Sequence, residues 1–176
     1  IYLFIYALSS TFISTIVKMV YYDMFKNMNP TNPLYWKRPP GAHNCSGYYK
    51  YNSSPKNTAD SFPGKIGMPS GHSWGSFSLA MLSAFYIYAK DKQKKTINYW
   101  THLKISIVII IAIMIALSRT QYLGPLSAGG HGNNVGTVNC HSISQIIIGA
   151  LFGITQACIV RYTSLWDLIY LNDADV

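Results

Sequence analysis

Long apolar runs alternate with polar stretches along this chain. Four of the runs are close to the ~20 residues that a helix needs to cross ~30 Å of hydrocarbon. Because lipid offers the backbone no hydrogen bonds, a spanning segment of this kind must be helical. The pattern predicts an all-α, polytopic membrane helical bundle, with helices at residues 1–20, 72–89, 99–118 and 141–160.

The third run is the most apolar, with no charge between Ile105 and Leu117. A buried strand of a soluble fold also suits so Ile-rich a segment, but its length and its three companions favour a helix. Charged residues make up 11% of the chain, whereas soluble domains carry roughly a quarter. We therefore expect an integral membrane protein.

Successive helices run in opposite directions, so alternate connections share one side of a membrane. The loops at residues 21–70 and 120–140 then lie on one face, and the short loop at residues 89–102, with four lysines, lies on the other. The positive-inside rule makes the lysine loop cytoplasmic and the other face lumenal or exterior. Two N-x-Ser sequons, at Asn44 and Asn52, mildly support this orientation.

The net charge of +8 fits anionic lipid head groups better than nucleic acid, for which the chain has no binding motif. Its 176 residues favour a single domain. The chain begins inside an apolar run, without Met, a basic stretch or a small-residue cleavage site. We expect no signal peptide, and we expect the chain to lack its original N-terminus.

The stretch Pro69-Ser70-Gly71-His72, where the second apolar run begins, is the richest in candidate chemistry. The amides and dipole of a first helical turn favour an anion, and Gly71 lets the backbone approach one closely. Ser70 can donate another hydrogen bond, and His72 can exchange a proton near neutral pH. A simple helix N-cap at Ser70 explains the same stretch equally well.

Arg38, Arg119 and His141 lie on the same predicted face. Arginine binds phosphate through a planar, bidentate fork. Taken singly, each residue has a plainer interpretation: a solvated loop charge for Arg38, an interface anchor for Arg119 and an interfacial histidine for His141. Taken with Ser70 and His72, they indicate phosphate chemistry at a membrane surface.

The three cysteines bear on compartment and on metal binding. Cys45 and Cys140 lie in the predicted lumenal loops, where an oxidising compartment favours a disulfide, and Cys158 is expected to be a buried free thiol. A metal site made by Cys45, Cys140, His43 and His141 is an alternative, but the spacing fits no zinc pattern. We predict a Cys45–Cys140 disulfide and no metal or cofactor.

Together these motifs resemble the phosphatidic acid phosphatase type 2 family of membrane phosphatases. That family shows K-x6-R-P, then P-S-G-H, then S-R-x5-H-x3-D. This chain has, in the same order, Lys37-Arg38-Pro39, Pro69-Ser70-Gly71-His72, Ser118-Arg119 and His141. The resemblance covers about residues 21–153. It implies a six-helix phosphatase core, of which this chain holds helices three to six and lacks the first two.

Two residues depart from the family pattern. Thr31 stands at the motif lysine, for which Lys26 or Lys37 is a candidate substitute, and Gln145 stands at the aspartate. The step from Arg119 to the histidine is also longer than in the family. His141 is chosen over His131 because the residues that follow His141 resemble the start of the family's last helix.

The resemblance implies a metal-independent mechanism. His141 attacks phosphorus to form a phosphohistidine, and His72 protonates the leaving oxygen and then activates water. Gln145 orients His141 but brings no charge, so an acidic residue there is expected to raise turnover. The groups that hold the phosphoryl oxygens are Arg38, Ser70, Gly71 and Arg119.

The site at helix ends favours an amphiphilic substrate in the bilayer, either a lipid phosphate or a polyprenyl diphosphate. The resemblance thus implies a lipid phosphatase or diphosphatase with its active site facing the lumen or exterior. Thr31 and Gln145 leave open a second hypothesis, a catalytically weak or inactive relative that binds lipid phosphates.

Overall fold

The computed structural model describes residues 2–39, 66–120 and 140–163. These residues form four α-helices: α1 (Tyr2–Phe25), α2 (Gly71–Gln93), α3 (Tyr99–Leu117) and α5 (Ile143–Arg161). Over the same ranges there is no strand, only an isolated antiparallel bridge between Lys37 and Ile66. The prediction of an all-α fold is confirmed for the described residues. Each predicted run corresponds to one helix, but α1 and α2 end later than predicted, at Phe25 and Gln93 instead of residues 20 and 89.

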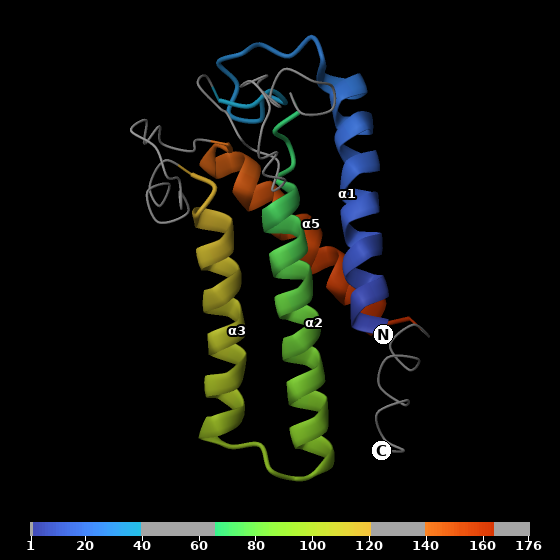
Figure 1. Ribbon diagram of the computed structural model, residues 1–176, viewed down its shortest axis with the longest axis vertical. Helices are drawn as coiled ribbons and strands as arrows, with labels where there is room; N and C mark the ends of the chain where they lie inside the picture. The colour runs from blue at the N-terminus through green and yellow to red at the C-terminus, as the bar shows by residue number, and fades with distance from the viewer. Residues whose placement is uncertain (1, 40–65, 121–139, 164–176) are drawn as a thin grey trace, which may run out of the picture.

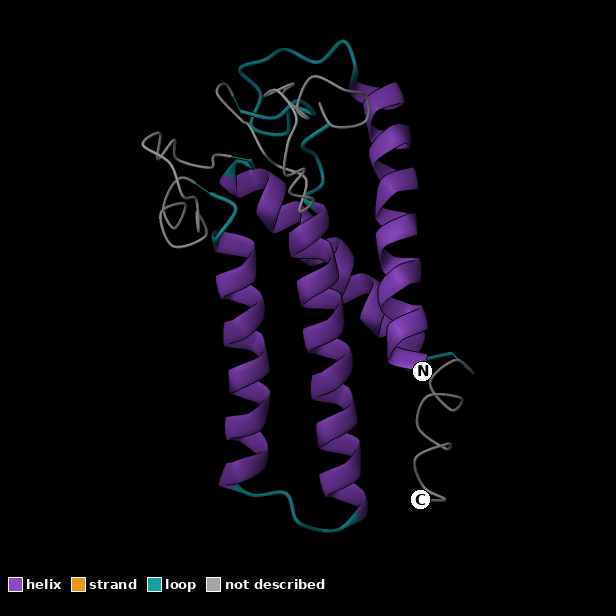
Figure 2. Cartoon of the chain, in the orientation of Figure 1, coloured by secondary structure: helices purple, strands orange, loops and turns teal. Residues whose placement is uncertain are grey.

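The four helices are arranged around α2. Figure 1 shows α2 between α1 and α3, with α5 crossing behind it at a steep angle, and α2 contacts all three. The C-terminal ends of α1 and α3 and the N-terminal ends of α2 and α5 point to the same end of the molecule (Figure 1). Figure 2 shows the short α2–α3 connection closing the opposite end. This is the arrangement that alternating helix directions predict.

Capping side chains define where three of the helices begin. The Ser70 side chain caps α2 by accepting a hydrogen bond from the backbone three residues further on. Asn98 with Thr101, and Ser142 with Gln145, form capping boxes at the starts of α3 and α5. Ser70 is therefore a helix N-cap, as the simpler interpretation predicted, and this role does not bear on whether it also binds an anion. The last helix begins two residues later than predicted.

Two glycines on one face of α5 allow it to lie close against α2. A Cβ atom on Gly149 would lie 2.5 Å from the Ser70 carbonyl oxygen, and one on Gly153 would lie 2.3 Å from the Trp74 carbonyl oxygen. Small residues four positions apart are the usual means by which helix backbones approach closely in membranes. The start of α5 is thereby fixed against the start of α2.

Two of the described helices, α3 and α5, are long and apolar enough to cross a membrane. The predicted spans in α1 and α2 are helical but are not among these candidates. Many large apolar side chains of α3 are exposed, a pattern that soluble domains rarely show: Ile107, Ile110, Ile111, Ile113, Met114 and Ile115. These features are consistent with association with a membrane.

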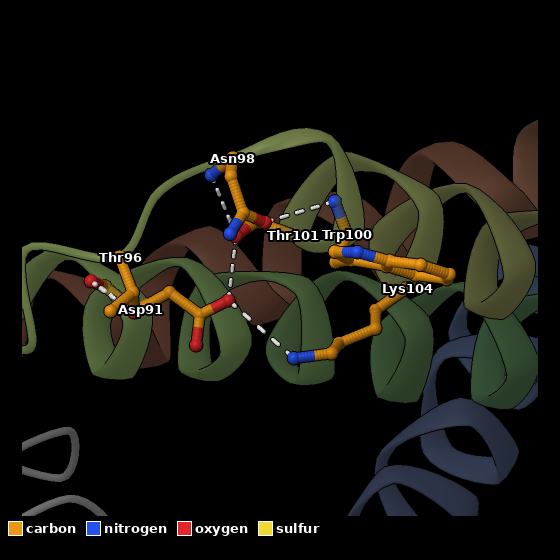
Figure 3. A network of polar contacts seen from close by, with 6 residues as sticks. All are labelled: Asp91, Thr96, Asn98, Trp100, Thr101 and Lys104. Carbon is orange, nitrogen blue, oxygen red and sulfur yellow. Dashed lines mark hydrogen bonds and ion pairs between the residues drawn. The ribbon is translucent and has the colours of Figure 1, made fainter.

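A polar cluster holds α2 and α3 together beside the short connection that joins them (Figure 3). Thr101 Oγ1 donates a hydrogen bond to Asp91 Oδ2 at 2.7 Å, and Lys104 Nζ lies 3.6 Å from the same oxygen. Such cross-links fix the register of neighbouring helices. The other ends of these two helices carry His72 and Arg119.

Candidate active site

Residues 33–38, which follow α1, form a segment that we call the arginine strap because it ends at Arg38. The backbone N–H groups of Gly67 and Met68 both donate to the Trp36 carbonyl oxygen, at 2.7 and 3.2 Å. The strap is thus joined to the segment that leads into α2. Arg38 is partly buried there.

Gln145, in the first turn of α5, links the strap to His141. Its Nε2 atom donates to the carbonyl oxygens of Tyr35 and Lys37, at 3.1 and 2.9 Å. Its Oε1 atom lies 3.3 Å from His141 Nδ1 and accepts from the Ser142 N–H at 3.3 Å. Both ends of the amide are therefore engaged, and the predicted contact between Gln145 and His141 is present.

Arg38 determines which nitrogen of His141 carries the proton. Arg38 Nη1 donates to the Cys140 carbonyl oxygen at 2.9 Å and lies 3.2 Å from His141 Nε2. Because a guanidinium can only donate hydrogen bonds, Nε2 must accept, and Nδ1 carries the hydrogen that Gln145 Oε1 accepts. The lone pair of His141 Nε2 thus points toward the guanidinium group of Arg38, a kind of group that binds phosphate well.

Burial and positive neighbours keep His141 neutral. Only 1% of the residue is exposed. Burial is the largest cause that holds the pKa of His141 well below 6.5, and Arg38, Lys18 and His72 depress it further. Burial, followed by the charge of Arg119, lowers the pKa of the Arg38 guanidinium from 12.5 to about 10. A neutral imidazole is the form that has a lone pair with which to attack phosphorus.

Lys18, a residue that the sequence analysis did not single out, reaches this region from α1. A Cβ atom on Gly71 would lie 3.5 Å from Lys18 Nζ. The charge of Lys18 acts on His72 and on His141. The signal in the sequence is a single charged residue within an apolar run. In a membrane helix such a residue is costly to bury and by default suggests a functional role.

The two candidate substitutes for the motif lysine, Lys26 and Lys37, have exposed side chains. Lys26 is exposed and pairs with the carboxylate three residues before it, at 3.3 Å. The side chain of Lys37 is exposed, as is Thr31. The charges that act on His72 are instead those of Arg119, Lys18 and Arg38.

Arg119 connects the end of α3 to the start of α5. Its carbonyl oxygen accepts hydrogen bonds from the N–H groups of Cys140 and His141, at 3.1 and 3.3 Å. Its charge acts on His72 and on Arg38. Burial lowers the pKa of the Arg119 guanidinium. This backbone junction fixes the end of α3 next to His141.

The start of α2 supplies backbone and hydroxyl groups. Ser70 is fully buried, and its N–H donates to the Gln145 carbonyl oxygen at 3.0 Å. A Cβ atom on Gly71 would meet only ordinary contacts, with Lys18 Nζ at 3.5 Å and Ser14 Oγ at 3.6 Å. Packing within the protein therefore leaves room for a side chain at position 71. A bound ligand that approaches the backbone closely would explain why the residue is glycine.

The cysteines now bear on the metal alternative. Cys140 is disulfide-bonded. Cys158 is a free thiol as predicted, but it is only partly buried. The predicted partner, Cys45, lies outside the described residues, so the pairing stays a prediction. A disulfide sulfur offers no thiolate to a metal, and the described residues contain no group of three or more potential ligands. Other features that fall outside the described residues are His43, Asn44, Asn52 and His131.

Positive side chains therefore gather at one end of the helices. Both carboxylates of the described residues pair with lysines elsewhere, Asp23 with Lys26 and Asp91 with Lys104. Cations that are held together are stabilised by a bound anion, and guanidinium groups match phosphate. The gathered cations are Lys18, Arg38 and Arg119, and they lie beside His72 and His141.

A family model described as the PAP2 superfamily matches residues 1–123. The match covers more than half of the chain and includes Arg38, Ser70, Gly71, His72 and Arg119. The chain belongs to the PAP2 superfamily. This match confirms the resemblance predicted from the motifs. Since PAP2 proteins are generally phosphatases, it also supports phosphatase activity. The PAP2 match ends before the start of α5. No curated protein and no solved structure matches the chain.

Proposed function

We propose that this PAP2-family protein is an integral membrane phosphatase that hydrolyses a phosphate monoester or diphosphate of a lipid through a phosphohistidine. The observation that carries the proposal is the 3.2 Å contact between His141 Nε2 and Arg38 Nη1. It sets a nucleophilic lone pair beside a group suited to phosphate. The charges of Lys18 and Arg119 supplement that of Arg38.

In the first step, a phosphoryl oxygen replaces His141 Nε2 as an acceptor of Arg38, which frees the Nε2 lone pair. The Nε2–P bond then forms as the bond between phosphorus and the leaving oxygen breaks. His72, which is protonated once the anionic phosphate is bound, gives a proton to that oxygen and becomes neutral. The products are phosphohistidine and either a lipid alcohol or, from a diphosphate, a lipid monophosphate.

In the second step, neutral His72 takes a proton from water as the water oxygen attacks phosphorus. The P–Nε2 bond breaks, inorganic phosphate leaves, and His141 returns to the form whose Nδ1–H meets Gln145. Fixed donors stabilise the charge on the transferring group without a metal ion. The donors that we assign to this role are Arg38, Ser70, the Gly71 amide and Arg119.

Lys18 takes the role that the family pattern gives to a lysine seven residues before Arg38. It comes from α1 instead of the strap, and its ammonium group approaches the start of α2. A cation there is placed to hold the phosphoryl oxygen that faces the amides of the first turn.

A lipid substrate is supported by the place of the positive cluster, at the ends of α3 and α5, which are candidate spans. A head group at the membrane surface would meet the cluster while its chains remain in lipid. We extend the proposal to a polytopic bundle of α1, α2, α3 and α5, equivalent to helices three to six of the family core. The site faces the lumen or exterior, since Lys92, Lys94 and Lys95 lie at the opposite end.

Phosphate release from phosphatidate, lysophosphatidate and a polyprenyl diphosphate, by the protein purified in detergent, tests this function. We expect release from at least one substrate, undiminished by EDTA and inhibited by vanadate, which mimics the transferring phosphoryl group. His141→Ala should abolish release. The control is His102→Ala, which changes an exposed histidine near the other end of α3.

Two outcomes would contradict the proposal. Loss of activity in EDTA that a divalent ion restores would support metal catalysis. Binding of lipid phosphates without release from any of them would support the second hypothesis, an inactive relative that binds these lipids.

A further inference from the structure

Gln145 makes contacts that the aspartate of the family pattern cannot make. Its Nε2 atom donates to two carbonyl oxygens of the arginine strap, Tyr35 O at 3.1 Å and Lys37 O at 2.9 Å. A carboxylate has no hydrogen to donate. An aspartate is also one methylene shorter and begins from the same helical position.

The surroundings are shaped to the amide. Gln145 is 2% exposed. A Cβ atom on Gly67 would lie 2.6 Å from Gln145 Oε1 and 2.7 Å from Nε2, so the amide is packed directly on the Gly67 backbone. A glutamate would fit this space, but one of its oxygens would face the two strap carbonyl oxygens. Those carbonyl groups would lose their donors and meet a negative charge.

The two ends of the amide act on two different parts of the site. Oε1 holds His141 Nδ1–H, which leaves Nε2 as the attacking atom. Nε2 of Gln145 holds the carbonyl group of Lys37, the residue before Arg38, and Arg38 contacts His141 Nε2. The amide thus closes a ring of contacts around the reacting nitrogen.

We propose that Gln145 is a positioning residue that holds His141 and Arg38 as one unit, and that this site requires an amide at position 145 in place of a carboxylate. The inference rests on the proposed phosphatase function. It reverses the sequence-based expectation that an acidic residue at this position raises turnover.

The decisive variant is Gln145→Glu, assayed for phosphate release across pH. We expect kcat/KM at pH 7.5 to fall at least about tenfold, with KM rising and kcat falling, because both Arg38 and His141 are displaced. The deficit should shrink as pH falls, since a protonated carboxyl group regains one donor for the strap. If Gln145→Glu equals or exceeds the wild type at neutral pH, the proposal is wrong.

Several charged groups affect the titration of a glutamate at this position. His141, which precedes α5, contacts Gln145, and Arg38 of the strap contacts His141. Lys18 of α1 and His72 of α2 are close enough to lower the pKa of His141. All of them favour the carboxylate, whereas burial and the two carbonyl oxygens favour the protonated form. A loss that stays constant between pH 5 and pH 8 would contradict the proposed donor role.

Gln145→Met and Ser144→Ala separate positioning from general loosening of the strap. Methionine keeps the length of the side chain but has no donor, so activity should fall at least about tenfold at every pH, without a change in the shape of the profile. Ser144 donates to the Pro33 carbonyl oxygen of the same strap without contacting His141. Ser144→Ala should change kcat/KM less than about threefold. Wild-type activity in Gln145→Met would overturn the inference.

A measurement of the histidine ring distinguishes failure of this inference from failure of the proposed function. Nitrogen-15 NMR of histidine-labelled wild-type protein, with His141 assigned by comparison with His141→Asn, reports the tautomer without any need for catalysis. We expect a neutral ring protonated at Nδ1. A ring protonated at Nε2 would overturn the inference even if phosphate is released. Absence of phosphate release with the Nδ1–H form present would sink the proposed function alone.

Discussion

Lys18 is the residue whose contribution depends most on the folded structure. It lies inside α1, yet its ammonium group approaches the start of α2 and its charge acts on both histidines. A lysine held among other cations does not stabilise the fold by itself. Its position is best explained by an anionic ligand.

Replacing Lys18 by methionine tests this role. We expect kcat/KM for a lipid phosphate to fall about tenfold or more, chiefly through KM, because a cation that contacts a desolvated phosphate is worth at least ~1.4 kcal/mol. The melting temperature should stay unchanged or rise, since the substitution removes repulsion between like charges. Initial rates and thermal unfolding in detergent provide both values.

Lys26→Met and Lys37→Met are the matched controls, since both change exposed lysines near the same end of the molecule. Each should alter kcat/KM by less than about twofold. An equal loss in all three variants would point to non-specific attraction of the anionic lipid, and wild-type kinetics in Lys18→Met would exclude the proposed contact.

Single residues differ in how far the sequence could predict them. The contact between His141 and Gln145 was predictable, because residues four apart near a helix start lie on one face. The approach of Lys18 was not, because it depends on how α1 packs against α2. The donation from Gln145 to the strap was also unpredictable, since it depends on the path of a loop that has no periodic pattern.

At the scale of helices, the close packing of α5 on α2 positions the start of both. Gly149 and Gly153 leave no room for a Cβ atom against the α2 backbone, whereas Gly71 has room for one. Glycine therefore serves two different purposes in neighbouring helices. Substitution of Gly149 or Gly153 should therefore affect stability, whereas substitution of Gly71 should affect activity.

Alanine substitutions at these three glycines should have different effects. Gly149→Ala and Gly153→Ala should destabilise the protein by ~1–3 kcal/mol, because the new methyl groups overlap backbone atoms of α2. Gly71→Ala should keep the wild-type stability but lower kcat/KM severalfold, because the methyl group obstructs a phosphoryl oxygen. Thermal unfolding and phosphate release are the measurements.

Gly75→Ala is the control for these variants, since nothing lies within 4 Å of a Cβ atom there. It should be neutral or slightly stabilising, as expected for alanine in a helix interior. If Gly71→Ala were fully active, or as unstable as Gly149→Ala, the ligand-contact role of position 71 would be wrong.

The helices themselves were the most predictable part of the structure. Apolar runs of nearly twenty residues predicted α3 and α5 closely, because composition and length decide such segments. The end of α1 was predicted too early, since the helix continues through a polar turn to Phe25. The start of α5 was predicted too early because Ser142, not His141, is the N-cap.

At the scale of the whole molecule, the charged side chains of the described residues lie toward the two ends of the helices. One end gathers Lys18, Arg38 and Arg119 near His141. The other end carries the short, lysine-rich connection between α2 and α3 (Figure 1) and the Asp91 cluster (Figure 3). Alternating helix directions predicted this arrangement. What the alternation could not predict is how deep the site lies, because depth depends on the strap and on the tilt of α5.

The proposed mechanism depends most directly on His141 as the nucleophile. Rapid acid-free quenching of a reaction with phosphorus-32-labelled lipid phosphate, followed by peptide mass spectrometry, locates any phosphorylated residue. We expect an alkali-stable, acid-labile phosphate on His141 in the wild type, and no labelled protein in His141→Ala. Label on another residue, or release of phosphate with inversion at phosphorus and no labelled protein, would contradict the mechanism.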